Sequence, residues 1–255
     1  MAGAGYRDGT ARLAGALARL LPQSRREPWV NAGMLDGPRI GPAAGGAARQ
    51  LVVLLHGRGA NGADLLHAVP MLARALPHAA FAAPDAPNRA AGSQGGREWF
   101  SVPGRDRLAD AIRAEKTAAG VRAAAPLVDA FIDAERAALG LADDCLALLG
   151  FSQGCMMALH VGLRRPYPCA AILGYSGRLA APGRLAVEIA SRPPVLLCHG
   201  AFDPLVPFEE QGRAAAALEA AGIDVTTVRR PYLEHALDRE GLEAGAALLG
   251  RVWAG

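Results

Sequence analysis

The sequence has little of several residue types that mark particular classes of protein. Of its 27 basic residues only Lys116 is a lysine, the arginines are scattered along the chain, and the net charge is only +3. Aromatic residues make up 5% of the chain and lie far from any basic stripe. Because nucleic-acid binding needs a basic face, and single-strand binding also needs stacking aromatics, we expect no nucleic-acid partner.

Cysteine is also scarce, and its spacing matches no metal or redox motif. None of the four cysteines forms a C-x-x-C pair or stands at metal-ligand spacing with histidine. Three of them sit in apolar runs, which favours buried thiols in a reducing compartment over a disulfide framework. The four are Cys145, Cys155, Cys169 and Cys198.

A long apolar run is missing from the N-terminus. Residues 1–10 contain glycines, an arginine and an aspartate, and the leucines of residues 11–21 are interrupted by Arg12 and Arg19. The helical spacing of these leucines predicts a short amphipathic helix rather than a signal peptide or a membrane span. We therefore expect a cytoplasmic protein with no membrane span, in which residues 1–49 form an extension with this helix and the first strand or strands.

The rest of the chain alternates short aliphatic runs with helical patterns, and 51% of its residues are hydrophobic. This alternation predicts a mostly parallel sheet with helices on both faces, an α/β fold, in a single domain over residues 50–255. Pro126 is expected to kink or shorten one helix. The predicted strands are 51–55, 80–83, 145–149, 169–173, 195–198 and 225–228, and the predicted helices lie near 64–76, 117–139, 153–164, 209–221 and 241–249.

One segment interrupts the alternation. Residues 86–107 read APNRAAGSQGGREWFSVPGRDR and follow neither helical nor strand periodicity. A stretch of this length without regular structure is uncommon in a compact domain and is usually functional or disordered. Trp99 and Phe100 favour an ordered pocket wall, and we predict that these two residues bind substrate.

The strongest local signal is the pentapeptide Gly150-Phe151-Ser152-Gln153-Gly154, which follows the apolar run CLALL and precedes the helical pattern QGCMMALHVGLRR. A G-x-S-x-G sequence between a strand and a helix forms a sharp turn that lifts the serine hydroxyl clear of the sheet. The glycines keep side chains out of the crowded corner, and the helix N-terminus faces developing negative charge. We predict that Ser152 is a nucleophile.

A serine hydroxyl is a weak nucleophile and needs a base that a carboxylate holds in place. Asp203 follows the apolar run VLLC and its turn, at the same sheet edge as Ser152, whereas Asp224 begins the next run at the opposite edge. His235 is the only histidine after Asp203, and the expected chain order is serine, acid, histidine. We therefore predict a catalytic triad of Ser152, Asp203 and His235.

Acyl transfer at such a serine also needs two N–H donors for the oxyanion that forms on the substrate. One is expected from the residue after the nucleophile, Gln153, and the other from the HGRG loop after the first aliphatic run. We predict the backbone N–H groups of Arg58 and Gln153. His56 of the same loop is expected to support the loop by hydrogen bonding rather than to react.

Taken together, these residues resemble the phospholipase/carboxylesterase family, which also contains the acyl-protein thioesterases. The resemblance covers about residues 51–249 and rests on LVVLLHGRGANGADLL, FAAPDAPNR, REWF, LLGFSQGCMMALH, ILGYSG, CHGAFDPLVP and a final Y-x-x-H. It implies an α/β-hydrolase fold and hydrolysis of small-molecule carboxylic esters or thioesters by a Ser-Asp-His triad. It also implies no metal or organic cofactor, and a homodimer as a frequent assembly.

Two regions depart from the family pattern. The family usually has a glycine beside the histidine, whereas Leu233 and Glu234 precede His235 here and Ala236 follows it, and the loop at 89–96 differs as well. A carboxylesterase or lysophospholipase-like enzyme is the main hypothesis, with a thioesterase acting on acyl-proteins or small acyl thioesters as the alternative. A dienelactone-hydrolase-like enzyme would carry cysteine in place of Ser152, and a non-catalytic binding module would be expected to lack a triad residue.

Overall fold

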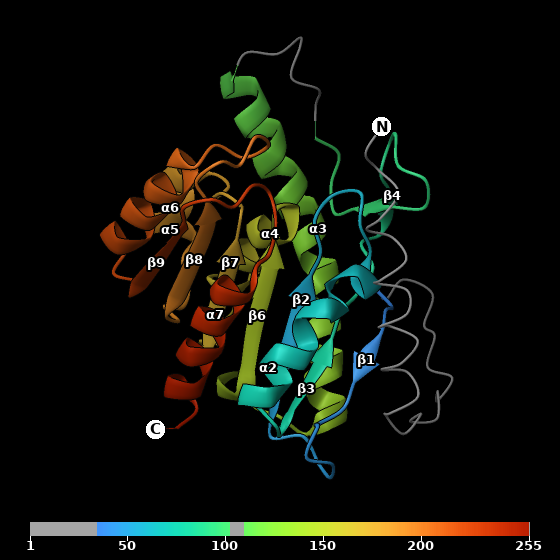
Figure 1. Ribbon diagram of the computed structural model, residues 1–255. Coiled ribbons are helices and arrows are strands. Elements are labelled where there is room, and N and C mark those ends of the chain that lie inside the picture. The colour runs from blue at the N-terminus through green and yellow to red at the C-terminus, as the bar shows by residue number, and fades with distance from the viewer. Residues whose placement is uncertain (1–34, 103–109, 255) are drawn as a thin grey trace.

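A seven-stranded sheet runs through the centre of the computed structural model, which describes residues 35–102 and 110–254 (Figure 1). The strand order is β1-β3-β2-β6-β7-β8-β9, and every neighbouring pair is parallel except the antiparallel pair of β1 and β3. The amphipathic helix predicted in residues 11–21 lies outside the described residues. The strands are β1 (Arg39–Ile40), β2 (Gln50–Leu55), β3 (Ala79–Ala82), β6 (Leu146–Phe151), β7 (Ala171–Tyr175), β8 (Val195–Gly200) and β9 (Val225–Arg230).

Helices cover both faces of this sheet, and the strands contribute side chains to a hydrophobic cluster on each face. In β2, for example, Val53 joins one cluster and Leu54 the other. Strands buried on both faces need unbroken aliphatic runs, and LVVLL is one. The predicted α/β fold is confirmed. One face carries α3 (Asp110–Leu139), α4 (Gln153–Gly162), α5 (Leu185–Glu188) and α6 (Glu209–Ala220), and the other carries η1 (Gly62–Ala68), α2 (Val69–Ala75) and α7 (Arg239–Val252), with short turns at η2 (Asp143–Cys145) and η3 (Pro182–Arg184).

Helix α3 continues through Pro126, so of the two effects expected of this proline, a kink or a shorter helix, the structure contradicts the second. Proline removes one helical hydrogen bond and crowds the preceding turn. Pro126 lies on the exposed side of α3, where the carbonyl group that loses its partner can bind water. The apolar side of α3, with Phe131 and Ile132, packs against the sheet and holds the helix in place.

The segment predicted to be irregular contains a small antiparallel pair of strands. Strand β4 (Asn88–Arg89) pairs with β5 (Arg97–Glu98), and a backbone bridge joins Arg97 to Ala60 in the loop after β2. The strands are too short to show a periodicity in the sequence. The bridge attaches the β4–β5 pair to the loop that was predicted to carry an oxyanion donor.

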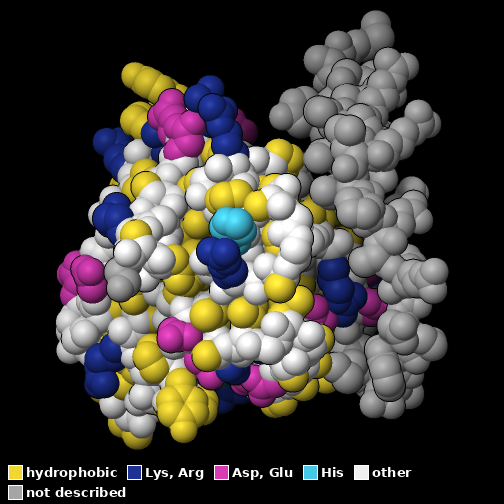
Figure 2. Space-filling model, turned by 90° about the horizontal axis from the view of Figure 1, so that it is seen from below, with side chains coloured by type: hydrophobic (Ala, Val, Ile, Leu, Met, Phe, Trp, Pro, Cys, Tyr) yellow, Lys and Arg dark blue, Asp and Glu magenta, His cyan; other side chains and the backbone are white. Residues whose placement is uncertain are grey.

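The carboxyl ends of the parallel strands lie at one edge of the sheet, at the top of Figure 1. Ligands of open α/β sheets bind at this edge. Figure 2 views the opposite edge, where hydrophobic, basic and acidic side chains are interspersed. Within residues 35–102 and 110–254, no helix has the length and apolar character that crossing a bilayer requires.

Candidate active site

Ser152 lies in a sharp turn between β6 and α4. Its backbone angles, φ 55° and ψ −114°, belong to neither helix nor strand, which is a costly conformation for a residue with a side chain. Gly150 permits the turn, because a Cβ there would lie 2.2 Å from the carbonyl oxygen of Gly154. The Ser152 N–H donates to the Tyr175 carbonyl at 2.9 Å and ties the turn to β7. The strand–turn–helix setting expected for Ser152 is therefore present.

The structure brings the three predicted triad residues into one hydrogen-bonded chain. Ser152 Oγ lies 2.9 Å from His235 Nε2, and His235 Nδ1 lies 2.7 Å from Asp203 Oδ2. The Asp203 side chain is 0% exposed and that of His235 is 14% exposed. The carboxylate is thus shielded from water, while the imidazole borders solvent. The Phe151 ring packs against the imidazole with 4.9 Å between centroids.

The loop after β8 holds the Asp203 carboxylate from several directions. Its Oδ1 accepts hydrogen bonds from the N–H groups of Leu205 and Val206, both at 2.8 Å. Its Oδ2 faces a second imidazole besides His235, because His199 Nε2 lies 3.3 Å away. Both carboxylate oxygens are therefore engaged, and the orientation of the group is set by its own loop and by β8.

A glycine at the end of β8 brings the loop of His235 close to the loop of Asp203. A Cβ on Gly200 would lie 2.3 Å from the carbonyl oxygen of Leu233 and 2.4 Å from that of Glu234. The Phe202 N–H also donates to the Leu233 carbonyl at 3.0 Å. The Glu234 side chain is exposed, so the residues that depart from the family pattern leave the imidazole free to face Ser152.

The loop after β2 lies against the turn of Ser152. A Cβ on Gly57 would lie 3.3 Å from the Cβ of Ser152. The next N–H, that of Arg58, donates to no described residue. Gln153 is the first residue of α4, where a backbone N–H has no partner within the helix. The two predicted oxyanion donors therefore belong to the two segments that border Ser152.

His56 supports this loop with both ring nitrogens, as the sequence predicts. Its Nδ1–H donates to the Gly57 carbonyl at 2.8 Å, and its Nε2 accepts from the Ala86 N–H at 2.9 Å. Burial lowers the pKa of His56, which favours the neutral ring that this pair of contacts requires.

Trp99 and Phe100 lie beneath the loop rather than at an open surface. They are 1% and 4% exposed, which leaves their side chains little area for contact with a substrate. Trp99 Nε1–H donates to the His56 carbonyl at 2.8 Å. The Gln153 amide bridges both residues: its Oε1 accepts from the Trp99 N–H at 2.8 Å, and its Nε2 donates to the Phe100 carbonyl at 2.7 Å. Their contacts join the β2 loop to the start of α4.

The Arg58 side chain binds the segment around β5. Its Nε donates to Glu98 Oε2 at 2.7 Å, and a terminal nitrogen donates to the Ala91 carbonyl at 3.0 Å. The Glu98 side chain is 7% exposed, so Arg58 neutralises a nearly buried carboxylate. The contact with Ala91 is a second link between the predicted oxyanion loop and the loop at 89–96 that departs from the family pattern.

Two side chains at this site were not predicted from the sequence. The Gln153 side chain was not considered, because its partners Trp99 and Phe100 are more than fifty residues away in the sequence. His199 was passed over because it precedes Asp203, whereas the expected chain order places the histidine after the acid; it ends a strand only four residues before Asp203. That spacing was itself a signal, since a residue at the end of β8 and one in the following loop can face each other.

The buried thiols predicted from the sequence are confirmed at Cys155, Cys169 and Cys198, whereas Cys145, which was expected to begin a strand, ends η2 and is only half-buried. Burial raises the pKa of each of the three buried thiols to about 12, so they are neutral and unreactive near neutral pH. In the described part of the chain, no group of three or more His, Cys, Asp or Glu side chains is placed to hold a metal ion.

The chain is similar in sequence and in structure to known esterases and thioesterases. The esterase YpfH of Escherichia coli is 29% identical over 196 residues, 77% of this chain and 80% of that protein. Acyl-protein thioesterase 1 of Schizosaccharomyces pombe is 30% identical over 205 residues, 76% and 86% of the two chains. The crystal structure of esterase PE8 superposes with a TM-score of 0.80 at 39% identity and covers 86% of this chain and 99% of that one. The family model of phospholipase/carboxylesterase matches residues 41–249, and the chain belongs to this family of hydrolases.

Proposed function

We propose that this protein is a carboxylesterase, a serine-dependent hydrolase of carboxylic esters, in which Ser152, His235 and Asp203 form the catalytic triad. The observation that carries the proposal is the continuous hydrogen-bonded chain from Ser152 Oγ through the His235 ring to Asp203 Oδ2, at 2.9 Å and 2.7 Å. A serine in this arrangement can lose its proton to the imidazole as it attacks.

In the first half of the reaction, Ser152 Oγ attacks the acyl carbon of the ester and its proton moves to His235 Nε2. The tetrahedral intermediate carries negative charge on the former carbonyl oxygen, which the N–H groups of Arg58 and Gln153 stabilise. Asp203 holds the ring with Nδ1–H directed at its carboxylate. When the intermediate collapses, the bond to the leaving alcohol breaks and His235 gives its proton to that oxygen.

In the second half, water takes the place of the alcohol. His235 Nε2 accepts a proton from the water as its oxygen attacks the acyl carbon of the acyl-enzyme. The second tetrahedral intermediate then collapses, the bond to Ser152 Oγ breaks, and the proton returns to the serine. The products are a carboxylic acid and an alcohol, and no redox step is needed.

Apolar side chains on the triad loops support a substrate with an apolar part. Phe202 and Leu205 flank Asp203 and are 64% and 55% exposed, and Tyr232 precedes His235 by three residues and is 90% exposed. Exposed apolar groups gathered on the loops of a site are typical of binding surfaces. We expect turnover of p-nitrophenyl esters to change with acyl chain length, and Leu205→Ser to reduce the preference for longer chains.

The direct test is Ser152→Ala. We expect the variant to lose both labelling by a fluorophosphonate probe and hydrolysis of p-nitrophenyl acetate, with a reduction of several orders of magnitude in kcat. Its thermal unfolding should match that of the wild type, because the substitution removes only one oxygen atom. Hydrolysis by the variant at the wild-type rate would refute the proposal.

A thioesterase is the second candidate, because relatives at about the same identity include acyl-protein thioesterases. The same triad can attack a thioester, and the leaving thiol needs less help from the protonated His235 than an alcohol does. Oxygen and sulfur esters with the same acyl chain, assayed in parallel on the wild type, decide between the two. A ratio of kcat/KM that favours the sulfur ester well beyond their intrinsic reactivities would support the thioesterase.

Localisation and assembly also remain proposals. The three buried free thiols favour a reducing compartment, so we propose that the protein acts in the cytoplasm. Fractionation of cells that produce the tagged protein tests this. Family resemblance favours a homodimer, and light scattering on the purified protein over a range of concentrations tests that assembly.

A further inference from the structure

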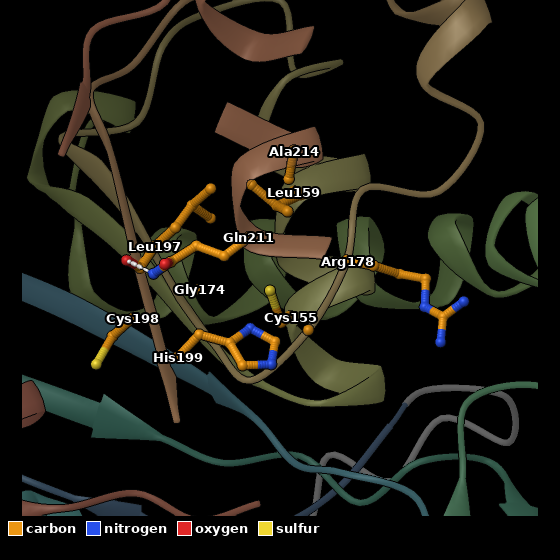
Figure 3. Close-up of a pocket in the computed structure, with 10 residues that line it drawn as sticks. Cys155, Leu159, Gly174, Arg178, Leu197, Cys198, His199, Gln211 and Ala214 are labelled. Carbon is orange, nitrogen blue, oxygen red and sulfur yellow. Dashed lines mark hydrogen bonds between the residues drawn. The ribbon is translucent and has the colours of Figure 1, made fainter. Parts of the chain in front are cut away.

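A second histidine lies behind the triad and is not used in the mechanism above. His199 is the next-to-last residue of β8 and is 2% exposed. Figure 3 shows its ring beside Cys155 of α4, with Gln211 of α6 close by, at a small cavity lined by these residues and Arg178. The Phe208 ring packs edge-on against the His199 ring, with 6.0 Å between centroids.

One ring nitrogen of His199 faces two oxygen atoms of the loop that carries the acid. His199 Nε2 lies 3.0 Å from the Val206 carbonyl oxygen and 3.3 Å from Asp203 Oδ2. A carbonyl oxygen only accepts hydrogen bonds, so Nε2 must carry the hydrogen atom. His199 therefore donates its hydrogen bond to the Val206 carbonyl of that loop, and the positive end of the same N–H dipole lies near Asp203 Oδ2.

We propose that His199 is a positioning residue of the catalytic site, which holds the Asp203 carboxylate and its loop in the orientation that the His235 imidazole requires. This inference rests on the proposed function. Both backbone polar groups of Val206 are hydrogen-bonded. Its N–H donates to Asp203 Oδ1 at 2.8 Å, and its carbonyl accepts from His199. Removing the His199 donor would free that loop turn and one face of Oδ2 together.

The His199 N–H dipole also acts on the carboxylate that holds His235. Asp203 Oδ2 lies 2.7 Å from His235 Nδ1 and 3.3 Å from His199 Nε2, so the nearby N–H weakens the attraction between Asp203 and a protonated His235. Loss of the donor should therefore let the catalytic base take up its proton at higher pH.

The other groups around the His199 ring come from four neighbouring elements. The Cys155 thiol of α4 is neutral, because burial raises its pKa to about 12. Gln211 of α6 is an uncharged amide that donates to the Leu197 carbonyl at 2.7 Å. The two cationic groups are Arg178, after β7, which lines the cavity, and Arg229 of β9, which stacks on Phe208. Asp203 is thus the carboxylate that His199 faces directly.

The test compares three variants of His199. His199→Gln places an amide Nε2–H near the original donor, His199→Met fills a similar volume without a donor, and His199→Asn has an amide that is too short to reach. We expect His199→Met and His199→Asn to lower kcat/KM for p-nitrophenyl acetate about tenfold, the scale of leaving one buried carbonyl without its hydrogen-bond donor. His199→Gln should retain most of the wild-type kcat/KM.

The decisive readout is the pH profile of kcat/KM and of the rate of fluorophosphonate labelling. In His199→Met and His199→Asn, the acidic limb of each profile should move to higher pH by about half a unit or more. In His199→Gln it should stay in place. If the pH profiles of His199→Met and His199→Asn superpose on that of the wild type, and the variants differ only in the amount of active protein or in Tm, the inference is overturned. If Ser152→Ala is active, the proposed function fails. If Ser152→Ala is inert and the pH profiles of His199→Met and His199→Asn are unshifted, only the proposed role of His199 fails.

Discussion

Gly154 and Leu55 touch through their backbones: a Cβ on Gly154 would lie 1.8 Å from the carbonyl oxygen of Leu55. This contact joins the start of α4 to the end of β2, one residue before His56. The second glycine of the G-x-S-x-G motif is therefore needed for the approach of the predicted oxyanion loop to Ser152, as well as for the turn itself.

Gly154→Ala should disrupt the site. The added methyl group meets a backbone atom that has no freedom to rotate away, so we expect a loss of stability of about 3 kcal/mol or more, or failure to fold. Gly250→Ala is the control, because Gly250 lies in α7 with nothing within 4 Å of its Cβ position. That variant should gain about 0.5–1 kcal/mol from helix propensity. Urea unfolding measures both, and a Gly154→Ala protein with wild-type stability would contradict the contact.

Trp99→Phe should loosen the oxyanion loop, because the His56 carbonyl then loses the indole N–H at 2.8 Å. We expect about a tenfold loss in kcat and about 1–3 kcal/mol in stability. Trp253→Phe is matched to it, since its Nε1–H donates to the Asp144 carbonyl at 3.0 Å, in the last turn after α7. That control should leave kcat unchanged. Equal effects of the two substitutions on kcat would exclude a specific role for Trp99.

The fold and the proposed triad follow from local features of the sequence. The aliphatic runs correspond to β2, β3 and β6–β9, and the strand–turn–helix motif places Ser152. Asp203 and His235 could be chosen because parallel strands end at a common edge and because the chain order of such residues is restricted.

The supporting contacts could not be predicted in the same way. Gln153 and Trp99 are 54 residues apart, and neither carries a local pattern that reports their hydrogen bond. Trp99 and Phe100 in an irregular segment suggested a pocket wall. Aromatic side chains are equally suited to burial beneath the loop after β2, which is where the structure places them. Pro126 was judged by its own chemistry, whereas the packing of α3 on the sheet decides its effect.

Removing the Arg58 side chain should destabilise the protein through Glu98. Arg58→Met leaves a carboxylate of 7% exposure without its partner at 2.7 Å, and we expect a cost of about 1–3 kcal/mol. Adding Glu98→Gln should recover part of that loss, because the buried group is then neutral.

The same double variant tests the backbone role of Arg58. If the N–H group is the oxyanion donor, kcat in the double variant should stay within a few-fold of the wild type. A loss above a hundredfold in a folded double variant would mean that the side chain itself takes part in the reaction.

Acid should destabilise the protein through His160 of α4, which is buried. Burial lowers the pKa of His160 from 6.5 to about 4. The unfolded chain therefore binds a proton at this residue more readily than the folded one, so stability is lost as the pH falls from 6.5 to about 4. The loss for this residue is about 3 kcal/mol at most, and His56, whose pKa is also lowered, adds to it.

His160→Leu should flatten this pH dependence between pH 7 and 4, as measured by urea unfolding at each pH. The exposed His67 provides the control, and His67→Gln should leave the slope as it is in the wild type. A leucine variant whose stability falls with pH as steeply as that of the wild type would contradict the assignment of the loss to residue 160.

The order of the proposed triad residues along the chain has a consequence for biosynthesis. Ser152 leaves the ribosome 83 residues ahead of His235, and the carboxylate that steadies the imidazole is also translated later. N-terminal segments can fold during synthesis, but a nascent polypeptide that ends before residue 235 has a serine without a general base. A translation product interrupted before residue 235 would therefore lack the proposed base, and it should hydrolyse acyl donors no faster than a serine outside a triad does.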